Sequence, residues 1–296
     1  MIKRVSTKGH ALTSICKFVG ISRQAYYRKL QKTVAKNNMY NTLEKVVIEN
    51  RKVKSRAGLR TIYHKEGLST SLGVNRFEQQ MSARGHALTP YKSDIKTTDS
   101  RGKTYIFDNL IEGYKVNNEN QVIVGDITYY QNQTGLYYIF QFTDYYTLEI
   151  KGLIGSKNME GINADRCLRQ VFKYNKQNKY DYGMIVHTDG GGQYRSHRYQ
   201  IMLKKAGILP SQAKNCFENG LAERVNGVIK NEYLIDHDIR SVNHLNRVLK
   251  QIQETANGLW PSKTLGYKTP KQYADSIRRL NVNERVVKIV KIVQQK

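Results

Sequence analysis

Three acidic residues occupy positions that an ordinary surface role explains poorly. Asp126 interrupts the apolar run VIVGDITYY, although aspartate is depleted in strands. A buried carboxylate needs a hydrogen-bonding partner or a metal ion. Asp189 follows the apolar run MIVHT and precedes three glycines that would let a substrate backbone come close. Glu223 lies beside the apolar stripe of a predicted helix. These residues are therefore candidates for a metal-binding or substrate-binding site.

Each candidate also has a structural interpretation, and the local sequence leaves both open. Asp126 also fits an aspartate that is hydrogen-bonded in the core, or the early end of a strand. Asp189 fits a plain Asp-Gly turn, which is a common pair. Glu223 fits a solvated helix glutamate. His187 is a further catalytic candidate beside the second aspartate, but a histidine at a strand end is more often structural.

The secondary-structure elements expected around these side chains indicate an α/β unit over residues 119–275. Three short runs rich in Val, Ile, Tyr and Thr suggest an antiparallel meander: QVIVGDITYYQ, GLYYIFQFT and TLEIKGLIG. A helix near 161–174, the strand YGMIVH, a helix near 197–206, the strand GILPS and a helix near 218–232 follow. This order predicts a mixed sheet with flanking helices, and the carboxyl ends of its strands are favoured places for a site.

A helix-turn-helix is predicted within residues 1–50. Gly20 permits a tight turn after a first helix, and Ser22 can cap a second one. The second helix presents side chains that are able to reach DNA bases or phosphates, and we predict that they bind DNA: Arg23, Gln24, Tyr27 and Arg28. An ordinary pair of packed helices remains the alternative.

The rest of the chain divides into three further predicted segments. Residues 51–88 form a second unit resembling a helix-turn-helix, with Arg76 on its outer face, and a packing role without DNA contact is about equally plausible. Residues 89–118 are polar and unpatterned, which predicts a linker. Residues 276–296 form a basic tail that fits either an amphipathic helix or a strand.

The composition of the chain favours a protein that binds a polyanion and argues against membrane and secreted proteins. The 296 residues include 49 Lys and Arg against 24 Asp and Glu, a net charge of +25, and such a chain usually has a polyanionic partner. The first 100 residues have 20 basic and 6 acidic residues, which favours DNA binding there. No apolar run is long enough for a membrane span, no secretory signal is evident, and the three distant cysteines favour a reducing cytosol.

Three segments carry a resemblance to a known family. GDITYY, HTDGGGQYRS and NCFENGLAERVNGVIKNEYL, in this order, resemble the catalytic segments of insertion-sequence transposases of the IS-three group, within the retroviral-integrase superfamily. ANGLWPSKTLGYKTP is similar to the family's segment after the core. The resemblance implies an RNase-H-like fold preceded by all-α helix-turn-helix units. It also implies a D-D-E triad that falls on Asp126, Asp189 and Glu223.

The resemblance further implies the chemistry and the metal. The three carboxylates would bind two Mg²⁺ ions, with Mn²⁺ able to substitute, for hydrolytic nicking of element ends and 3′-OH strand transfer. Arg224 and Lys230 are the expected DNA contacts beside them, since Lys230 lies two helical turns after Glu223. Glu218 and Glu232 are rival third ligands in the same segment.

The implied partners are the element ends, the target DNA and further copies of the chain, because two ends must be held together. We expect a homodimer or higher oligomer on DNA, a cytoplasmic and nucleoid-associated location in a bacterium, and no membrane partner. Two other functions stay open at this stage. One is a related metal nuclease that never joins strands, and the other is a DNA-binding regulator with an inactive core.

Overall fold

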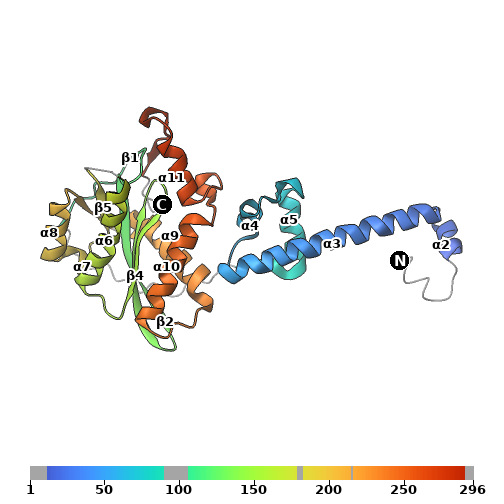
Figure 1. The fold of residues 1–296 in the computed structure, drawn as a ribbon, viewed down its shortest axis with the longest axis horizontal. Helices are drawn as coiled ribbons and strands as arrows, with labels where there is room; N and C mark the ends of the chain where they lie inside the picture. The colour runs from blue at the N-terminus through green and yellow to red at the C-terminus, as the bar shows by residue number, and fades with distance from the viewer. Residues whose placement is uncertain (1–11, 90–105, 179–182, 215, 291–296) are drawn as a thin grey trace.

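The computed structural model describes residues 12–89, 106–178, 183–214 and 216–290. The parts of the predicted helix-turn-helix, linker and basic tail that fall on 1–11, 90–105 and 291–296 lie outside the described residues. A long helix carries the N-terminal region away from a mixed α/β body (Figure 1). No helix in the described residues is long and apolar enough to span a membrane.

The body is built on a five-stranded sheet in the order β4-β3-β2-β5-β6. Strands β2 (Val122–Asn132), β3 (Gly135–Asp144) and β4 (Ile150–Ser156) are antiparallel neighbours, as the predicted meander requires. Strands β5 (Ile185–Thr188) and β6 (Leu209–Gln212) continue the sheet in parallel with β2. The predicted mixed sheet with flanking helices is therefore confirmed.

Helices cover both faces of this sheet (Figure 1). On one face, α6 (Gly161–Asn178), α7 (Gly192–Arg195) and α8 (His197–Lys205) pack over a core that includes Phe140, Phe142 and Val186. On the other face lie α9 (Gly220–Val228) and α10 (Val242–Gly258). Helix α7 begins at Gly192, the third glycine of the turn after β5, and the sequence pattern did not predict it.

The predicted helix before Tyr233 is more irregular than a single α-helix. A 3₁₀ turn, η3 (Cys216–Asn219), leads into α9, and a π-helical turn, η4 (Ile229–Tyr233), follows it. The chain then forms η5 (Leu234–Asp236) before α10, and η6 (Lys263–Leu265), α11 (Pro270–Arg278) and η7 (Val282–Glu284) after it. Within the helix predicted near 218–232, only the nine residues of α9 keep regular α-helical geometry.

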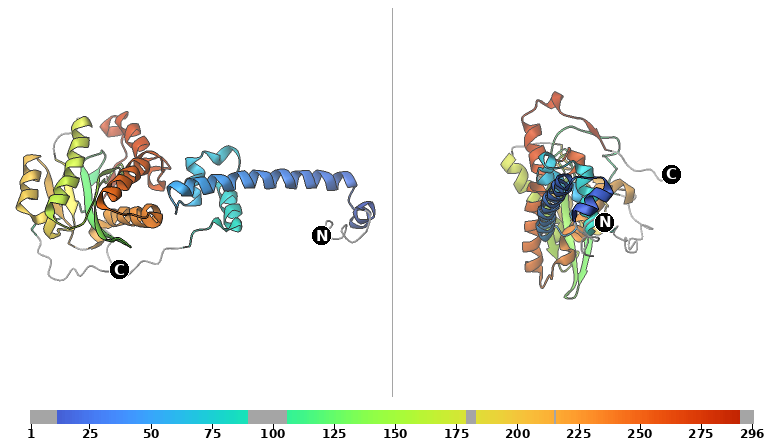
Figure 2. Two further views of the ribbon diagram at one scale, coloured as in Figure 1. Left: turned by 60° about the horizontal axis from the view of Figure 1, so that its bottom comes forward. Right: turned by 90° about the vertical axis from the view of Figure 1, so that its right-hand side faces the viewer.

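The N-terminal region is helical, as predicted, but its second helix is much longer than the sequence pattern indicates. Helix α2 (Leu12–Val19) ends at Gly20, whose φ of 72° makes the turn, and the Ser22 side chain accepts a hydrogen bond from the amide of Ala25 at the start of α3 (Arg23–Val53). In α2, Ile15 and Cys16 are buried but Phe18 is 92% exposed, so only part of the apolar surface of this helix is covered. The first half of α3 projects from the body (Figure 2).

A compact helical unit forms around the second half of α3. Helices α4 (Leu59–Lys65) and α5 (Val74–Met81), with η1 (Leu68–Thr70) and η2 (Ser82–His86), bury Ile62, Phe77 and Met81 against α3. This helical unit shares a continuous core with the residues around Tyr233 and Trp260. The helical unit and the sheet body are thus packed directly on each other.

Polar and aromatic contacts reinforce that packing. Lys54 forms an ion pair with Glu232 at 2.7 Å, and Ser55 donates a hydrogen bond to the Glu232 carbonyl. His64 stacks on Tyr267 with ring centroids 3.5 Å apart. Because Lys54 is only 13% exposed, the ion pair is well shielded from solvent.

Two segments outside the five-stranded sheet also belong to the body. Strand β1 (Lys115–Val116) pairs with β7 (Lys288–Ile289), so this part of the predicted tail is a strand. The predicted linker from Ile106 onward lies against the body, where Ile111 is buried and Leu110 donates a hydrogen bond to Ser211.

A buried polar cluster joins the same region to α11. Lys151 is fully buried, and its Nζ lies 3.8, 3.7 and 4.0 Å from carboxylate oxygens of Glu119, Asp144 and Glu149. Arg278 of α11 donates two hydrogen bonds to Glu119. This cluster holds the start of β4 against the end of β3, and its charges compensate one another in the interior.

Candidate active site

Strand pairing brings Asp126 and Asp189 together. The parallel register pairs Val124 with His187, so the two aspartates, each two residues further on, hold equivalent positions on neighbouring strands. Side chains alternate between the faces of a sheet, and Val122, Val124 and Ile185 face α9. Both carboxylates therefore lie on the α9 side, at the carboxyl end of β5.

Helix α9 completes the site from above this edge of the sheet. The amide of Asn226 donates a 2.8 Å hydrogen bond to Asp126 Oδ2, and the amide of Asn219 donates to the carbonyl of Gly125. Glu223 lies one turn before Asn226, on the same side of the helix. Asn226 is 4% exposed, and its Oδ1 has no hydrogen-bond partner among the described residues.

The pKa of Asp126 responds to the charges of both other candidate carboxylates. Burial raises the pKa of Asp126 from 3.8 to about 7, and the negative charges of Asp189 and Glu223 add to the rise. The hydrogen bond from Asn226 acts in the opposite direction. The three candidates thus form one coupled group of negative charges, although they come from three separate segments.

Two glycines have a steric reason to be at the site. A Cβ on Gly125 would lie 2.2 Å from the ring of Phe142, which packs over the backbone beside Asp126. Gly190 has a φ of 70°, and a Cβ there would lie 2.1 Å from the Gln212 amide. The turn after β5 is held further by the amide of Gly191, which donates a 3.0 Å hydrogen bond to Asp189 Oδ1.

The rival glutamates have other partners. Glu218 accepts hydrogen bonds from Asn109 at 2.7 Å and from the amide of Lys214 at 2.8 Å. Glu232 forms its ion pair with Lys54. Among these three glutamates, only Glu223 contributes to the pKa shift of Asp126.

His187 has a structural position. It is fully buried, its Nδ1 lies 2.8 Å from Ser211 Oγ, and burial lowers its pKa to about 4. It therefore stays neutral near pH 7 and links β5 to β6. Asn226 is the site residue that the sequence reasoning missed, and its spacing of three residues from Glu223 was the available signal.

The donor set at this edge fits a hard cation. Carboxylate and amide oxygens are the ligands that Mg²⁺ prefers, and the mutual repulsion at Asp126 is what a bound cation would relieve. Within the described parts of the chain, no three His, Cys, Asp or Glu side chains converge tightly enough to form a finished metal site.

The predicted DNA contacts fall into three separate regions. Four are exposed on the projecting end of α3: Arg23, Gln24, Tyr27 and Arg28. Arg76 is exposed on α5. Only Arg224 on α9 and Lys230 on η4 lie in the segment that carries Glu223.

Comparisons with known proteins agree with this architecture. Two family models, both described as an integrase core domain, match residues 116–215 and 207–270. An uncharacterized 31 kDa protein of insertion element IS600 from Shigella sonnei is 25% identical over 234 residues, covering 74% of this chain and 82% of that protein. The transposase for insertion sequence element IS904 from Lactococcus lactis is 27% identical over 217 residues, covering 72% and 83%.

Solved structures of retroviral integrases are more distant. A chain in the cryoEM structure of the simian T-cell lymphotropic virus intasome in complex with PP2A regulatory subunit B56 gamma is 18% identical, with a TM-score of 0.48. That match covers 82% of this chain and 77% of the other. The HTLV-2 integrase catalytic core domain, solved in complex with magnesium, is 20% identical, with a TM-score of 0.40, and the match covers 56% and 99%.

Proposed function

We propose that this chain, which belongs to the insertion-sequence transposases that carry an integrase core domain, nicks the DNA ends of its element and joins the freed 3′-OH to target DNA. The observation that carries the proposal is the position of Asp126 on β2 beside Asp189, the residue directly after β5. The charges of Asp189 and of Glu223 on α9 both raise the pKa of Asp126, which supports a shared role for the three carboxylates.

In this proposal, Asp126, Asp189 and Glu223 are the residues that hold divalent metal. Bound Mg²⁺, as one or two ions, would neutralise the charge that develops on the phosphodiester and polarise the attacking oxygen. Asn226 orients the Asp126 carboxylate through its hydrogen bond. The glycines after β5 leave room for the DNA backbone to approach Asp189 closely.

The two reactions balance without any further reactant. In the first, a water oxygen bonds to phosphorus and loses a proton, and the departing 3′ oxygen takes up a proton to become a 3′-OH. In the second, the oxygen of that 3′-OH bonds to a phosphorus of the target and loses its proton, and the displaced 3′ oxygen of the target takes up a proton. Each step exchanges one phosphodiester P–O bond for another P–O bond, so positioning and charge neutralisation carry the catalysis.

Recognition of the ends is assigned to the helical region. The four exposed side chains near the start of α3 project from the body, and no Asp or Glu occurs before Glu44 in the sequence. Their charge suits DNA phosphates, and a pair of ends would require at least two copies of the chain.

An assay with paired labelled ends and a plasmid target tests this function. We expect nicked ends and joined product with Mg²⁺ or Mn²⁺, and neither product in EDTA. Cut product without joining would instead identify a metal nuclease, and binding without cutting would identify a regulator. Replacing Asp189 with Asn should abolish both products while end binding persists.

A further inference from the structure

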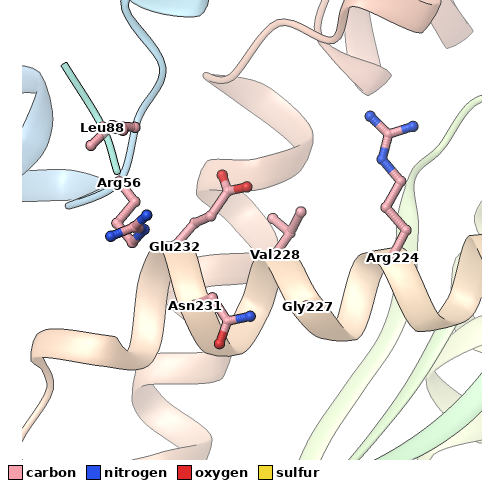
Figure 3. A pocket seen from close by; sticks show the side chains of 7 residues that line it. All are labelled: Arg56, Leu88, Arg224, Gly227, Val228, Asn231 and Glu232. Atoms are coloured by element: carbon pink, nitrogen blue, oxygen red, sulfur yellow. The ribbon is translucent and has the colours of Figure 1, made fainter. Parts of the chain in front are cut away.

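A groove of about 370 Å³ lies between the helical unit and the helix that carries Glu223 (Figure 3). Arg56 and Leu88 line it from the helical unit, and Arg224, Val228 and Glu232 line it from α9 and η4. In Figure 3 the last three side chains project from the same side of the helix, at a spacing of four residues. The groove therefore runs along the helix axis, starting beside Glu223.

The charges in the groove favour an anion. Arg56 and Arg224 form no ion pair with any residue that the structure describes, whereas the Glu232 carboxylate is neutralised by Lys54 at 2.7 Å. Arg56 also donates a hydrogen bond to the carbonyl of Thr89, which holds its side chain on the groove wall. An arginine held in place in this way loses less conformational freedom when it binds a phosphate.

The dimensions match a nucleic acid strand. Gly227 has no side chain, so a ligand backbone can approach the helix between the two arginines. Arg224 and Glu232 are eight positions apart, about 12 Å at 1.5 Å per residue. Arg56 lies at the Glu232 end of the groove. Neighbouring phosphates of one DNA strand are separated by about twice the ~3.4 Å axial rise, so this length corresponds to about two nucleotide steps.

We propose that this groove holds the phosphate backbone of one DNA strand at the element end, with Arg56 and Arg224 contacting phosphates about two nucleotides apart. This inference rests on the proposed transposase function and assigns Arg56, a residue of the helical unit, to the DNA path. The strand leaves the three carboxylates along α9 and passes beneath the helical unit. Docking of the helical unit through Lys54 and Glu232 thereby builds part of the binding surface for the cleaved end.

The test uses the full-length chain and element ends in which single phosphates are replaced by neutral methylphosphonates. In the wild-type protein, substitution at each of two positions about two nucleotides apart near the cleavage site should weaken binding about tenfold. In Arg56→Ala one of these positions should lose its effect, and in Arg224→Ala the other should. Each variant should also lower the salt dependence, the slope of log K against log salt concentration, by about 0.9.

Two controls separate this contact from loss of charge and loss of structure. Lys52→Ala removes a basic side chain that is 64% exposed outside the groove, and it should leave the interference pattern unchanged. Arg51→Ala removes a neighbouring arginine that donates a 2.8 Å hydrogen bond to the His86 carbonyl but does not line the groove. If Arg51→Ala reproduces the change seen with Arg56→Ala, Arg56 only fixes the chain near Thr89, and the proposal is wrong.

The two proposals fail in distinguishable ways. A wild-type chain that joins ends but keeps the same interference pattern in Arg56→Ala and Arg224→Ala overturns the groove alone. A wild-type chain that shows no phosphate interference and no cleavage overturns the proposed function and the groove together.

Discussion

Replacing Asp126 with Asn should stabilise the metal-free protein at neutral and alkaline pH while abolishing its chemistry. The folded state raises the pKa of Asp126 from 3.8 to about 7, through burial and through the charges of Asp189 and Glu223. The folded protein thus holds a proton that the unfolded chain releases between these values. Wild-type stability should therefore fall as pH rises from about 4 to 7 and then stay level.

The pKa shift sets an upper limit for this effect. A change from 3.8 to about 7 corresponds to about 4 kcal/mol at ~1.4 kcal/mol per pH unit. Relaxation of the half-buried side chain reduces this value, so we expect Asp126→Asn to gain about 1–3 kcal/mol at pH 8. The new amide can still accept the hydrogen bond from Asn226 through its oxygen. The gain should disappear near pH 4, where both chains are neutral at this position.

Urea unfolding between pH 4 and 9 in EDTA measures the difference in stability between the wild-type protein and Asp126→Asn. Mg²⁺ should stabilise the wild-type protein at pH 8, because it binds only the folded site, and should have little effect on Asp126→Asn. Glu254→Gln, at an exposed position on α10, is the control and should leave the pH dependence unchanged. Parallel stability curves for wild type and Asp126→Asn across this pH range would refute the reasoning.

Three further predictions address other parts of the chain. Glu223→Gln should lose nicking and joining but keep end binding, whereas Glu218→Gln should keep activity and lose no more than about 1 kcal/mol of stability, because the glutamine oxygen can still accept both hydrogen bonds; an active Glu223→Gln in the labelled-end assay would mean that the third ligand is assigned incorrectly. Lys151→Met should lower the free energy of unfolding by about 3–5 kcal/mol at pH 8, because it leaves Asp144 and Glu149 buried without their cation and Glu119 with Arg278 alone, and the loss should shrink in acid as Glu149, whose pKa burial raises, is protonated; equal urea midpoints at pH 8 would contradict this. Gly125→Ala should cost about 1–3 kcal/mol, because the new methyl group meets the Phe142 ring, and an unchanged melting temperature would show that the ring moves aside easily.

Local sequence was sufficient for the strands of the five-stranded sheet and for two of the three candidate ligands, but not for α7 or for the length of α3. The apolar runs of the meander, the glycine at the turn after α2 and the cap at Ser22 act through nearest neighbours, so a pattern can reveal them. Asp126 and Asp189 stood out because each breaks or ends an apolar strand run. Their proximity follows once the two strands are parallel neighbours in register.

Tertiary structure decided what depends on contacts between distant segments. Glutamates along the α9 region look alike in sequence, and only the docking of the helix on β2 places Glu223 near Asp126 and gives Glu218 and Glu232 other partners. The 31-residue length of α3 has no simple signal, because its exposed first half and its buried second half present different patterns. In the sequence, Lys151 has the character of a surface residue. Only the fold buries it and places the carboxylates of Glu119, Asp144 and Glu149 around its amine. The groove joins residues 168 positions apart at Arg56 and Arg224, a pairing that only the packing of two units creates.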